Sequence, residues 1–415
     1  MAIPSDQSTN QQIGGDGVAG SGLPIGRRVA QWRTRRGMTQ QVFADRLGKS
    51  ASWVDKVERG VRTLDRFSVI QEVAAVLRVD PLVLLGREAT PSVGANGASA
   101  GVDGVRAALA RYDAALSEPG AGPMSPPTEL ARSVEHAWLT YRHARYPQLL
   151  RTLPALIVDA QRAHYAGDAT ALLVQVYRVT ASVLVKCGEG GLAWLAADRA
   201  VAAADQSLLI ATSTIQLGEA LRAIGRGRLA MAATIAAAHR IAPAVPHDGP
   251  HDELAVCGAL LLQAALAAAS CGDAPSVREL VDQAAEIAEQ VGDGPGQHWI
   301  VFDSTTVELA RVVAAVELGR SAEAVVRHEQ VITRESWRRL SAEHRAAHLL
   351  NAARAYLLTG DLDGACRTLI EADRTAPAEV RTRPAGRTVL RELTRGGPVP
   401  ADVARLATAV GLTGR

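Results

Sequence analysis

Between residues 24 and 86, apolar residues recur at the spacing of short helices. In the first of these, Ile25, Val29 and Trp32 stand at i, i+4 and i+7, which places them on one buried stripe. Gly37 ends this helix. The pattern predicts further helices at 40–47, 50–60 and 66–78 and from Pro81 onward, so the segment forms a compact bundle of five helices.

Capping and turn residues mark the ends of the second and third helices. Thr39 and Ser50 are suited to cap the first turn of each helix with their hydroxyl groups. Gly48 allows a tight turn between the two helices, and Gly60 ends the third. The positions expected to face inward are Val42, Phe43, Leu47, Val54 and Val57.

From Thr128 onward the apolar pattern repeats. Long apolar helices end in glycine-containing turns and start again, with turn glycines at Gly188, Gly225, Gly272, Gly319 and Gly360. Units of this period bury their apolar faces by stacking on their neighbours, so the pattern predicts an α-solenoid. The expected helical pairs are 128–165, 169–204, 207–242, 251–291, 298–335 and 343–376.

Stretches of small and polar residues separate these parts. Residues 1–22 are rich in Gly, Ser, Gln and Asn and are predicted to be a disordered arm. Residues 87–127 are predicted to be a linker, with a short helix at 103–116. The expected organisation is an arm at 1–22, a helical bundle at 23–86, this linker, a repeat domain at 128–376 and capping helices at 377–415.

Composition and charge support an all-α fold and add a candidate partner. Hydrophobic residues make up 47% of the chain but aromatic ones only 4%. The net charge of the whole chain is +2, yet the segment from Pro24 to Arg66 carries +7, with eleven basic and four acidic side chains. A basic segment on a neutral-to-acidic body indicates a nucleic-acid-binding surface.

The remaining sequence features predict a cytoplasmic protein. None of the four cysteines lies in a Cys-x-x-Cys motif, as is usual in a reducing compartment. The first 22 residues lack the charged and apolar regions of a signal peptide. Since no run of 18 apolar residues escapes a charge or a break, no membrane span or membrane partner is expected. We expect a cytoplasmic, nucleoid-associated protein.

Residues 37–60 read GMTQQVFADRLGKSASWVDKVERG and fit the pattern G-x-T-Q-x-x-x-A-x-x-x-G-x-S-x-S-x-x-x-x-x-E-R-G. This segment resembles the Cro and cI-type (XRE-family) helix-turn-helix regulators, in which a small residue, here Ala44, lies where two helices cross. The resemblance implies a transcription regulator that binds double-stranded operator DNA. The third helix is then expected to lie in the major groove.

The resemblance and the side-chain chemistry together select the candidate DNA contacts. Lys56 can donate to guanine O6 or N7. The Ser52 hydroxyl can donate to or accept from a base edge, and Ala51 can touch a thymine methyl group. The family assigns a DNA contact to the position of Gln40. The predicted base-contacting residues are Gln40, Ser50, Ala51, Ser52 and Lys56. The predicted phosphate-backbone contacts are Arg28, Arg36, Thr39, Lys49, Trp53, Arg59 and Arg62.

Three residues of this segment have alternative interpretations. Trp53 packs either on the sugar-phosphate backbone or in the core. Asp55 either accepts a hydrogen bond from cytosine N4 or pairs with Lys56 or Arg59. Glu58 is expected to pair with an arginine of the first helix rather than to contact a base.

The repeat part resembles degenerate tetratricopeptide repeats, in the small residue after each turn and in the closing Ala-Pro. The overall plan resembles two groups of regulators. One is the peptide-pheromone receptors of Gram-positive bacteria; the other, closer in its Ala and Arg content, controls secondary metabolism or development in filamentous GC-rich bacteria. The resemblance implies a groove on the first helices of the pairs. The groove candidates are Trp138, Tyr141, Tyr177, Arg178, Gln216, Trp299, Arg311, Asn351 and Arg354.

These features predict a homodimeric repressor whose repeats sense a small molecule or peptide. Asn351 has no matching asparagines in the other repeats, which argues against a peptide. The alternatives are a regulator whose repeats dock a protein, and a scaffold with a vestigial helix-turn-helix.

No enzyme, cofactor or metal is expected. The HDGPHDE loop at 247–253 is interpreted as solvated, and His344 with His348 lacks a third ligand. The GDGPG run at 292–296 lacks the G-K-[ST] ending of a phosphate-binding loop.

Overall fold

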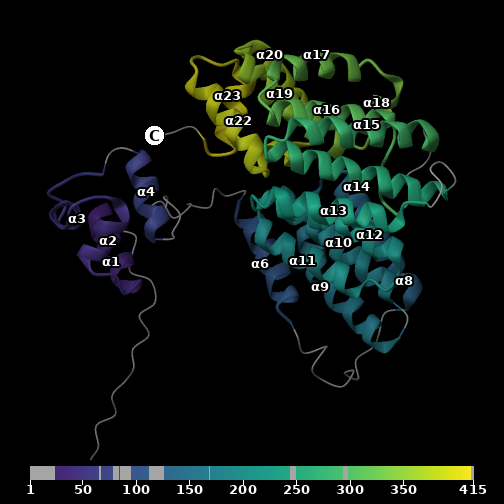
Figure 1. Cartoon of the computed structure of the whole chain (residues 1–415), viewed down its shortest axis with the longest axis horizontal. Coiled ribbons are helices and arrows are strands. Elements are labelled where there is room, and N and C mark those ends of the chain that lie inside the picture. Colours follow the sequence, from purple (N-terminus) through teal and green to yellow (C-terminus); the bar gives the residue numbers. More distant parts are fainter. Residues whose placement is uncertain are drawn as a thin grey trace, which may run out of the picture. The chain divides into compact units, whose positions relative to one another are not determined.

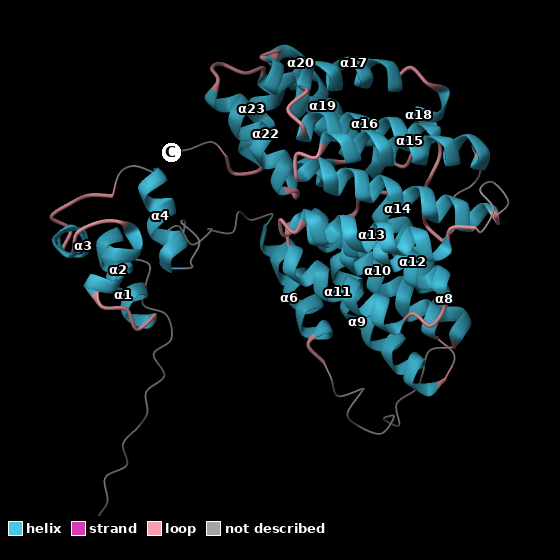
Figure 2. Cartoon of the chain, viewed as in Figure 1, coloured by secondary structure: helices cyan, strands magenta, loops and turns pink. Residues whose placement is uncertain are grey.

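The computed structural model describes residues 24–64, 67–77, 84, 95–111, 126–167, 169–243, 249–292 and 298–412. Every regular element in these residues is a helix (Figure 2), which confirms the all-α prediction. The chain divides into two compact units, Met1–Pro91 and Ser92–Arg415 (Figure 1).

The first unit is a small helical bundle. Its described helices are α1 (Ile25–Arg35), α2 (Gln40–Leu47), α3 (Ala51–Glu58) and α4 (Phe67–Leu77). Val29, Phe43 and Val54 are at most 1% exposed and form the centre of its core. The fifth helix expected from Pro81 lies outside the described residues except for Leu84, which is helical and fully buried.

The predicted caps of α2 and α3 are confirmed. The Thr39 hydroxyl accepts a hydrogen bond from the backbone N–H of Val42, and the Ser50 hydroxyl accepts one from Trp53, both at 3.2 Å. Gly48 ends α2 in the left-handed region, at φ +63°. The inward orientation expected for Val42 is wrong, since its side chain is 41% exposed. Successive helical residues point 100° apart, and Phe43 and Ala44 occupy the buried face.

A close crossing fixes α1 against α3. A Cβ atom on Gly26 would lie 1.9 Å from the carbonyl oxygen of Val57. Only glycine therefore lets the backbone of α1 rest directly on the end of α3. The apolar stripe of α1 predicts the contact, but not this approach of the two backbones.

The second unit contains the six expected helical pairs in chain order. They are α8 (Pro127–Arg142) with α9 (Tyr146–Ala166), α10 (Thr170–Lys186) with α11 (Gly190–Ala203), α12 (Ser207–Ala223) with α13 (Gly227–Ile241), α14 (His251–Ser270) with α15 (Ala274–Val291), α16 (Ser304–Glu317) with α17 (Ser321–Val331), and α19 (Ala342–Thr359) with α20 (Leu362–Thr375). The short α18 (Glu335–Arg339) precedes α19. The C-terminal helices are α21 (Pro377–Arg381), α22 (Pro384–Arg395) and α23 (Ala401–Ala409).

Glycine closes the turn inside five of these pairs. The predicted turn glycines, from Gly188 to Gly360, all have φ between +73° and +83°. This backbone conformation is strained for residues with a Cβ atom, so glycine is required by the turn itself. The predicted helix-turn-helix repeat is confirmed.

One helix occupies part of the stretch expected to be a linker. Helix α6 (Ala95–Leu109) begins before residue 103 and packs on α9, with Val105 and Leu109 fully buried. A Cβ on Gly101 would lie 2.8 Å from the Cβ of Leu150, and one on Gly104 would lie 3.1 Å from Pro154. Gly101 and Gly104 therefore serve close helix packing, where the sequence suggested flexibility.

Among the described residues, one helix is long and apolar enough to cross a membrane by length and composition alone. This is α14, in which a stretch of 18 residues has a mean hydropathy of 1.7 and is 72% buried within the structure. It packs against α13 and α15, and Phe302 lies on Gly258, where a Cβ would come within 2.0 Å of the ring. The apolar surface of α14 is thus used for packing between repeats.

Candidate nucleic-acid interface and repeat-domain interior

Helix α3 presents an exposed N-terminal face opposite its buried side. Ser50, Ser52 and Lys56 are exposed and Ala51 is half-buried, whereas Val54 on the other side of the helix is fully buried. A helix exposed in this way can enter the major groove with its first residues at the base edges. The structure therefore groups four of the five predicted base-contacting residues on one surface.

A buried carboxylate ties the three helices around this surface together. Glu58 is 5% exposed and forms a bidentate ion pair with Arg33 of α1, with N···O distances of 2.6 and 3.0 Å. This is the pairing with a first-helix arginine that the sequence predicted. Gln40, at the start of α2, donates its amide to the same carboxylate at 2.8 Å. The fifth predicted base contact is thus held by α3, and its amide oxygen and second amide N–H remain available to DNA.

The structure gives the surroundings of two residues whose roles the sequence left open. Asp55 pairs with Arg59 at 2.5 Å, while Arg59 stays 61% exposed. Exposed pairs of this kind are worth little, so the arginine can exchange its partner for a phosphate. Trp53 is half-buried and packs against the core of the unit, as in its core-packing interpretation.

The predicted phosphate contacts are mostly on the surface. Arg36, Thr39, Lys49, Arg59 and Arg62 are exposed. Arg28 differs, because it is half-buried and its Nη1 donates to the carbonyl oxygen of Leu84 at 3.0 Å. Arg28 is therefore engaged inside the unit. Arg27 and Arg46, which are not among the predicted contacts, are also exposed.

Five of the nine groove candidates in the repeat domain form one interior cluster. The rings of Trp138 and Trp299 stack with centroids 5.9 Å apart and planes 9° apart. The guanidinium carbon of Arg178 lies 5.4 Å from the Trp138 ring, and Arg178 Nε donates to Gln216 at 2.9 Å. Tyr141 meets the edge of Trp138 at 6.0 Å. These side chains are packed together, where the sequence predicted the lining of an open groove.

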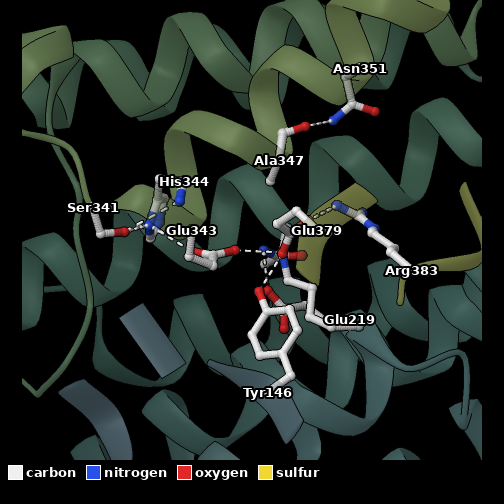
Figure 3. Close-up of polar contacts among 11 residues, drawn as sticks. Tyr146, Glu219, Ser341, Glu343, His344, Ala347, Asn351, Glu379 and Arg383 are labelled. Carbon is white, nitrogen blue, oxygen red and sulfur yellow. Dashed lines mark hydrogen bonds and ion pairs between the residues drawn. The ribbon is translucent and has the colours of Figure 1, made fainter. Parts of the chain in front are cut away.

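The other four candidates make hydrogen bonds or ion pairs with residues outside this set. Tyr177 accepts a hydrogen bond from Gln161 at 2.8 Å, and Asn351 donates to the carbonyl of Ala347 in its own helix at 3.0 Å (Figure 3). Arg354 pairs with Glu317 at 2.6 Å. Arg311 pairs with Asp282 at 3.0 Å and lines a cavity of about 300 Å³ among α15, α16 and α17.

A buried ion cluster that the sequence did not reveal joins early and late repeats (Figure 3). Lys186, at the end of α10, pairs with Glu343 of α19 and lies 2.9 Å from Glu379 of α21. Glu379 is fully buried; it also accepts a hydrogen bond from Tyr146 and pairs with Arg383 at 2.9 Å. Burial opposes the charge on Lys186, but the two carboxylates outweigh it and raise its pKa. The partners lie far apart in sequence, so no local pattern indicates them.

Two buried histidines form a second polar contact in the interior. His328 Nδ1 and His348 Nε2 are 3.0 Å apart, and Trp337 packs its ring against His348. His344, the other member of the pair considered for a metal, contacts Ser341 and Glu343. Among the described residues, no group of three or more His, Cys, Asp or Glu side chains is placed to hold a metal ion.

The histidine pair predicts a loss of stability in mild acid. Burial lowers the pKa of His328 to about 4 and that of His348 to about 3. In the unfolded chain histidine has a pKa of about 6.5, so both residues are protonated there at a pH where they stay neutral in the folded chain. The free energy of unfolding therefore falls as the pH drops below about 6.5. Between pH 7 and pH 5, the free energy of unfolding of His348→Leu should fall by about 2 kcal/mol less than that of the wild type. Urea unfolding at both pH values measures this difference.

Replacement of the exposed His143 by leucine is the control, and it should leave the pH dependence within about 0.5 kcal/mol of the wild type. Equal acid losses in wild type and His348→Leu would contradict the prediction.

Comparisons with known proteins bear on the first unit. Residues 24–85 match the family model of a helix-turn-helix domain. No curated protein matches the sequence. Among solved structures, PlcR of Bacillus thuringiensis, in complex with the peptide PapR7 and DNA, aligns with 75% of this chain and 99% of its own at 12% identity and a TM-score of 0.24. Residues 24–85 in the N-terminal unit of this chain therefore form a helix-turn-helix domain.

Proposed function

We propose that the protein binds operator DNA as a homodimer through α3 and represses transcription, and that its repeat domain receives the controlling signal. One observation carries the DNA-binding part: Ser52 and Lys56 are exposed on a helix whose opposite side is fixed by Gly26 and by the Glu58 carboxylate. A rigid helix with a polar, partly cationic outer face is suited to base recognition in the major groove. Repression follows most simply, because it requires only that the protein occupy a promoter.

The proposed dimer follows from the small size of this surface. Few side chains on α3 reach outward, and those that do are short apart from Lys56. Two units bound to a palindrome, with half-sites about 34–36 Å apart, would double the contacts. The exposed cations around α3 supply the sequence-independent part of the affinity.

The alternative proposal gives the repeats a protein partner instead of a small ligand. Two large apolar side chains on second helices favour it: Trp194 on α11 is 47% exposed and Leu229 on α13 is 59% exposed. Exposed aromatic and aliphatic side chains are common anchors of protein interfaces.

Binding of the purified protein to fragments of its own genomic DNA at near-physiological salt, followed by sequencing, tests the proposed function. We expect a few sharply enriched sites that share a palindrome. Lys56→Ala should relax the preference at one position of each half-site by about 1–3 kcal/mol and leave the other positions unchanged. An unchanged profile would remove Lys56 from the base-contacting set.

Binding with no sequence preference and no dependence on salt would contradict DNA recognition and support the vestigial alternative. Ser276→Ala, in the repeat domain, provides a matched control that should leave the enriched palindrome unaltered.

A further inference from the structure

A short segment of the chain occupies the inner side of the early repeats. Residues His298 to Asp303 precede α16, yet the Trp299 ring stacks on Trp138 of α8. The carbonyl oxygen of His298 accepts a hydrogen bond from Arg178 Nη1 of α10 at 3.1 Å. An aromatic ring and an adjacent carbonyl oxygen from one segment are thus bound by a tryptophan and a buried arginine.

The backbone of this segment is strained where it makes these contacts. His298 has φ +51° and Trp299 has φ +64°, in the left-handed region, where a bulky residue such as Trp299 is an outlier. Among the described residues, Ala144 is the one other non-glycine residue with a positive φ. Such strain persists only where the surrounding contacts impose it. Release of Trp299 from Trp138 and Arg178 would therefore also relieve strain.

Arg178 is incompletely satisfied by its present partners. The side chain is fully buried, its Nε binds Gln216, and its Nη1 is shared between Gln175 at 3.0 Å and the carbonyl of His298. Nη2 is buried with no hydrogen-bond partner, and no carboxylate within the described residues forms an ion pair with this guanidinium. Burial lowers the pKa of Arg178 to about 9, against the opposing effect of the Glu219 charge. A carboxylate would supply the missing acceptor and place a negative charge in direct contact with the guanidinium.

We propose that the repeat domain binds a small aromatic carboxylate in the place of Trp299, its ring stacked on Trp138 and its carboxylate held by Nη1 and Nη2 of Arg178. The inference rests on the proposed sensor role of the repeats and names the ligand class. The His298 carbonyl carbon is bonded to the nitrogen of Trp299, so one short segment supplies both the acceptor and the ring that now fill the site. An indole carboxylate reproduces the ring and improves the acceptor. Gln216 accepts from Nε and Gln175 from Nη1, and these hydrogen bonds orient the guanidinium.

Calorimetric titration of the full-length protein, without DNA, tests the inference. Indole-3-acetate is the probe, and tryptamine, with the same ring and a positive charge, is its control. The wild type should bind indole-3-acetate and not tryptamine. Arg178→Gln should weaken binding at least about tenfold, because the charge-assisted pair is lost.

The decisive variant is Trp299→Gly, which should bind indole-3-acetate about tenfold more tightly than the wild type. It removes the internal competitor, and glycine tolerates φ +64°. A purely structural role for Trp299 predicts the opposite, namely weaker or unchanged binding. This gain keeps the inference testable even where Arg178→Gln fails to fold.

Absence of indole-3-acetate binding in both the wild type and Trp299→Gly would overturn the inference, as would equal binding of tryptamine. DNA binding is measured separately on the same proteins. A chain that binds specific DNA but no indole-3-acetate overturns the ligand class alone, whereas one that binds indole-3-acetate but no DNA overturns the regulatory function alone.

Discussion

Replacement of Lys186 by methionine is expected to lower the free energy of unfolding of the repeat domain by about 3 kcal/mol or more. Methionine is of similar length and fits the space, but it removes the cation between two carboxylates that are 5% and 0% exposed, Glu343 and Glu379. Breaking a buried pair costs more than the pair contributes, because the remaining charges stay buried. Glu379 keeps Arg383 at 2.9 Å, which places the loss toward the lower end of the usual range.

Urea unfolding followed by circular dichroism at pH 7 measures this loss. Arg395→Met is the surface control, since Arg395 is 68% exposed and its pair with Glu392 should contribute less than about 1 kcal/mol. In the Lys186→Met background, Glu343→Gln should recover part of the stability by removing one uncompensated charge. A loss for Lys186→Met no larger than that for Arg395→Met would mean that the cluster does not stabilise the fold.

The cluster matters because it links repeats that are distant in sequence. In a solenoid each repeat normally contacts only its neighbours, so stability is built up along the chain. Here Lys186 of the second pair binds α19 and α21, and α19 also contacts α8. The early and late repeats should therefore unfold in one transition, and loss of the cluster should separate that transition into two.

Local sequence signals predicted most of the fold. The hydroxyl caps at Thr39 and Ser50 and the turn glycines act on backbone groups within a few residues, so they can be recognised without knowledge of the tertiary structure. Helical periodicity likewise places each pair correctly. The Glu58 pair with α1 was also predicted, because the family pattern brings these helices together.

Contacts between distant segments account for what the sequence did not predict. Trp138, Arg178 and Gln216 were expected to line an open groove, but the segment at Trp299 packs onto them. That segment lies 120 residues beyond Arg178, with nothing in its sequence to indicate where it packs. Gly101 and Gly104 of α6 were misinterpreted for the same reason. A glycine in a flexible stretch and a glycine at a helix crossing look alike until the partner, here Leu150, is known.

Neutralisation of three exposed cations around α3 is expected to weaken DNA binding on the order of 100-fold at physiological salt. The variant carries Lys49→Gln, Arg59→Gln and Arg62→Gln, all at exposed positions. Each proposed phosphate contact releases condensed counterions from DNA, so the slope of log affinity against log salt should become shallower by about 3 for each bound helix-turn-helix unit. Fluorescence anisotropy on an enriched genomic site, between 50 and 300 mM salt as a rough working range, measures both quantities.

A matched control separates local phosphate contacts from overall charge. Arg374, Arg395 and Arg405 are 68–74% exposed near the C-terminus, and their replacement by glutamine changes the net charge equally. If the cations around α3 contact phosphates, the control keeps the wild-type slope of log affinity against log salt. The first variant has a shallower slope and a lower affinity, to the same extent for all DNA sequences. Equal losses in the two variants would show that net charge alone drives the affinity. In that case α3 would no longer be supported as the DNA-contacting helix, because a surface that positions the protein on the duplex must be sensitive to where its charges lie.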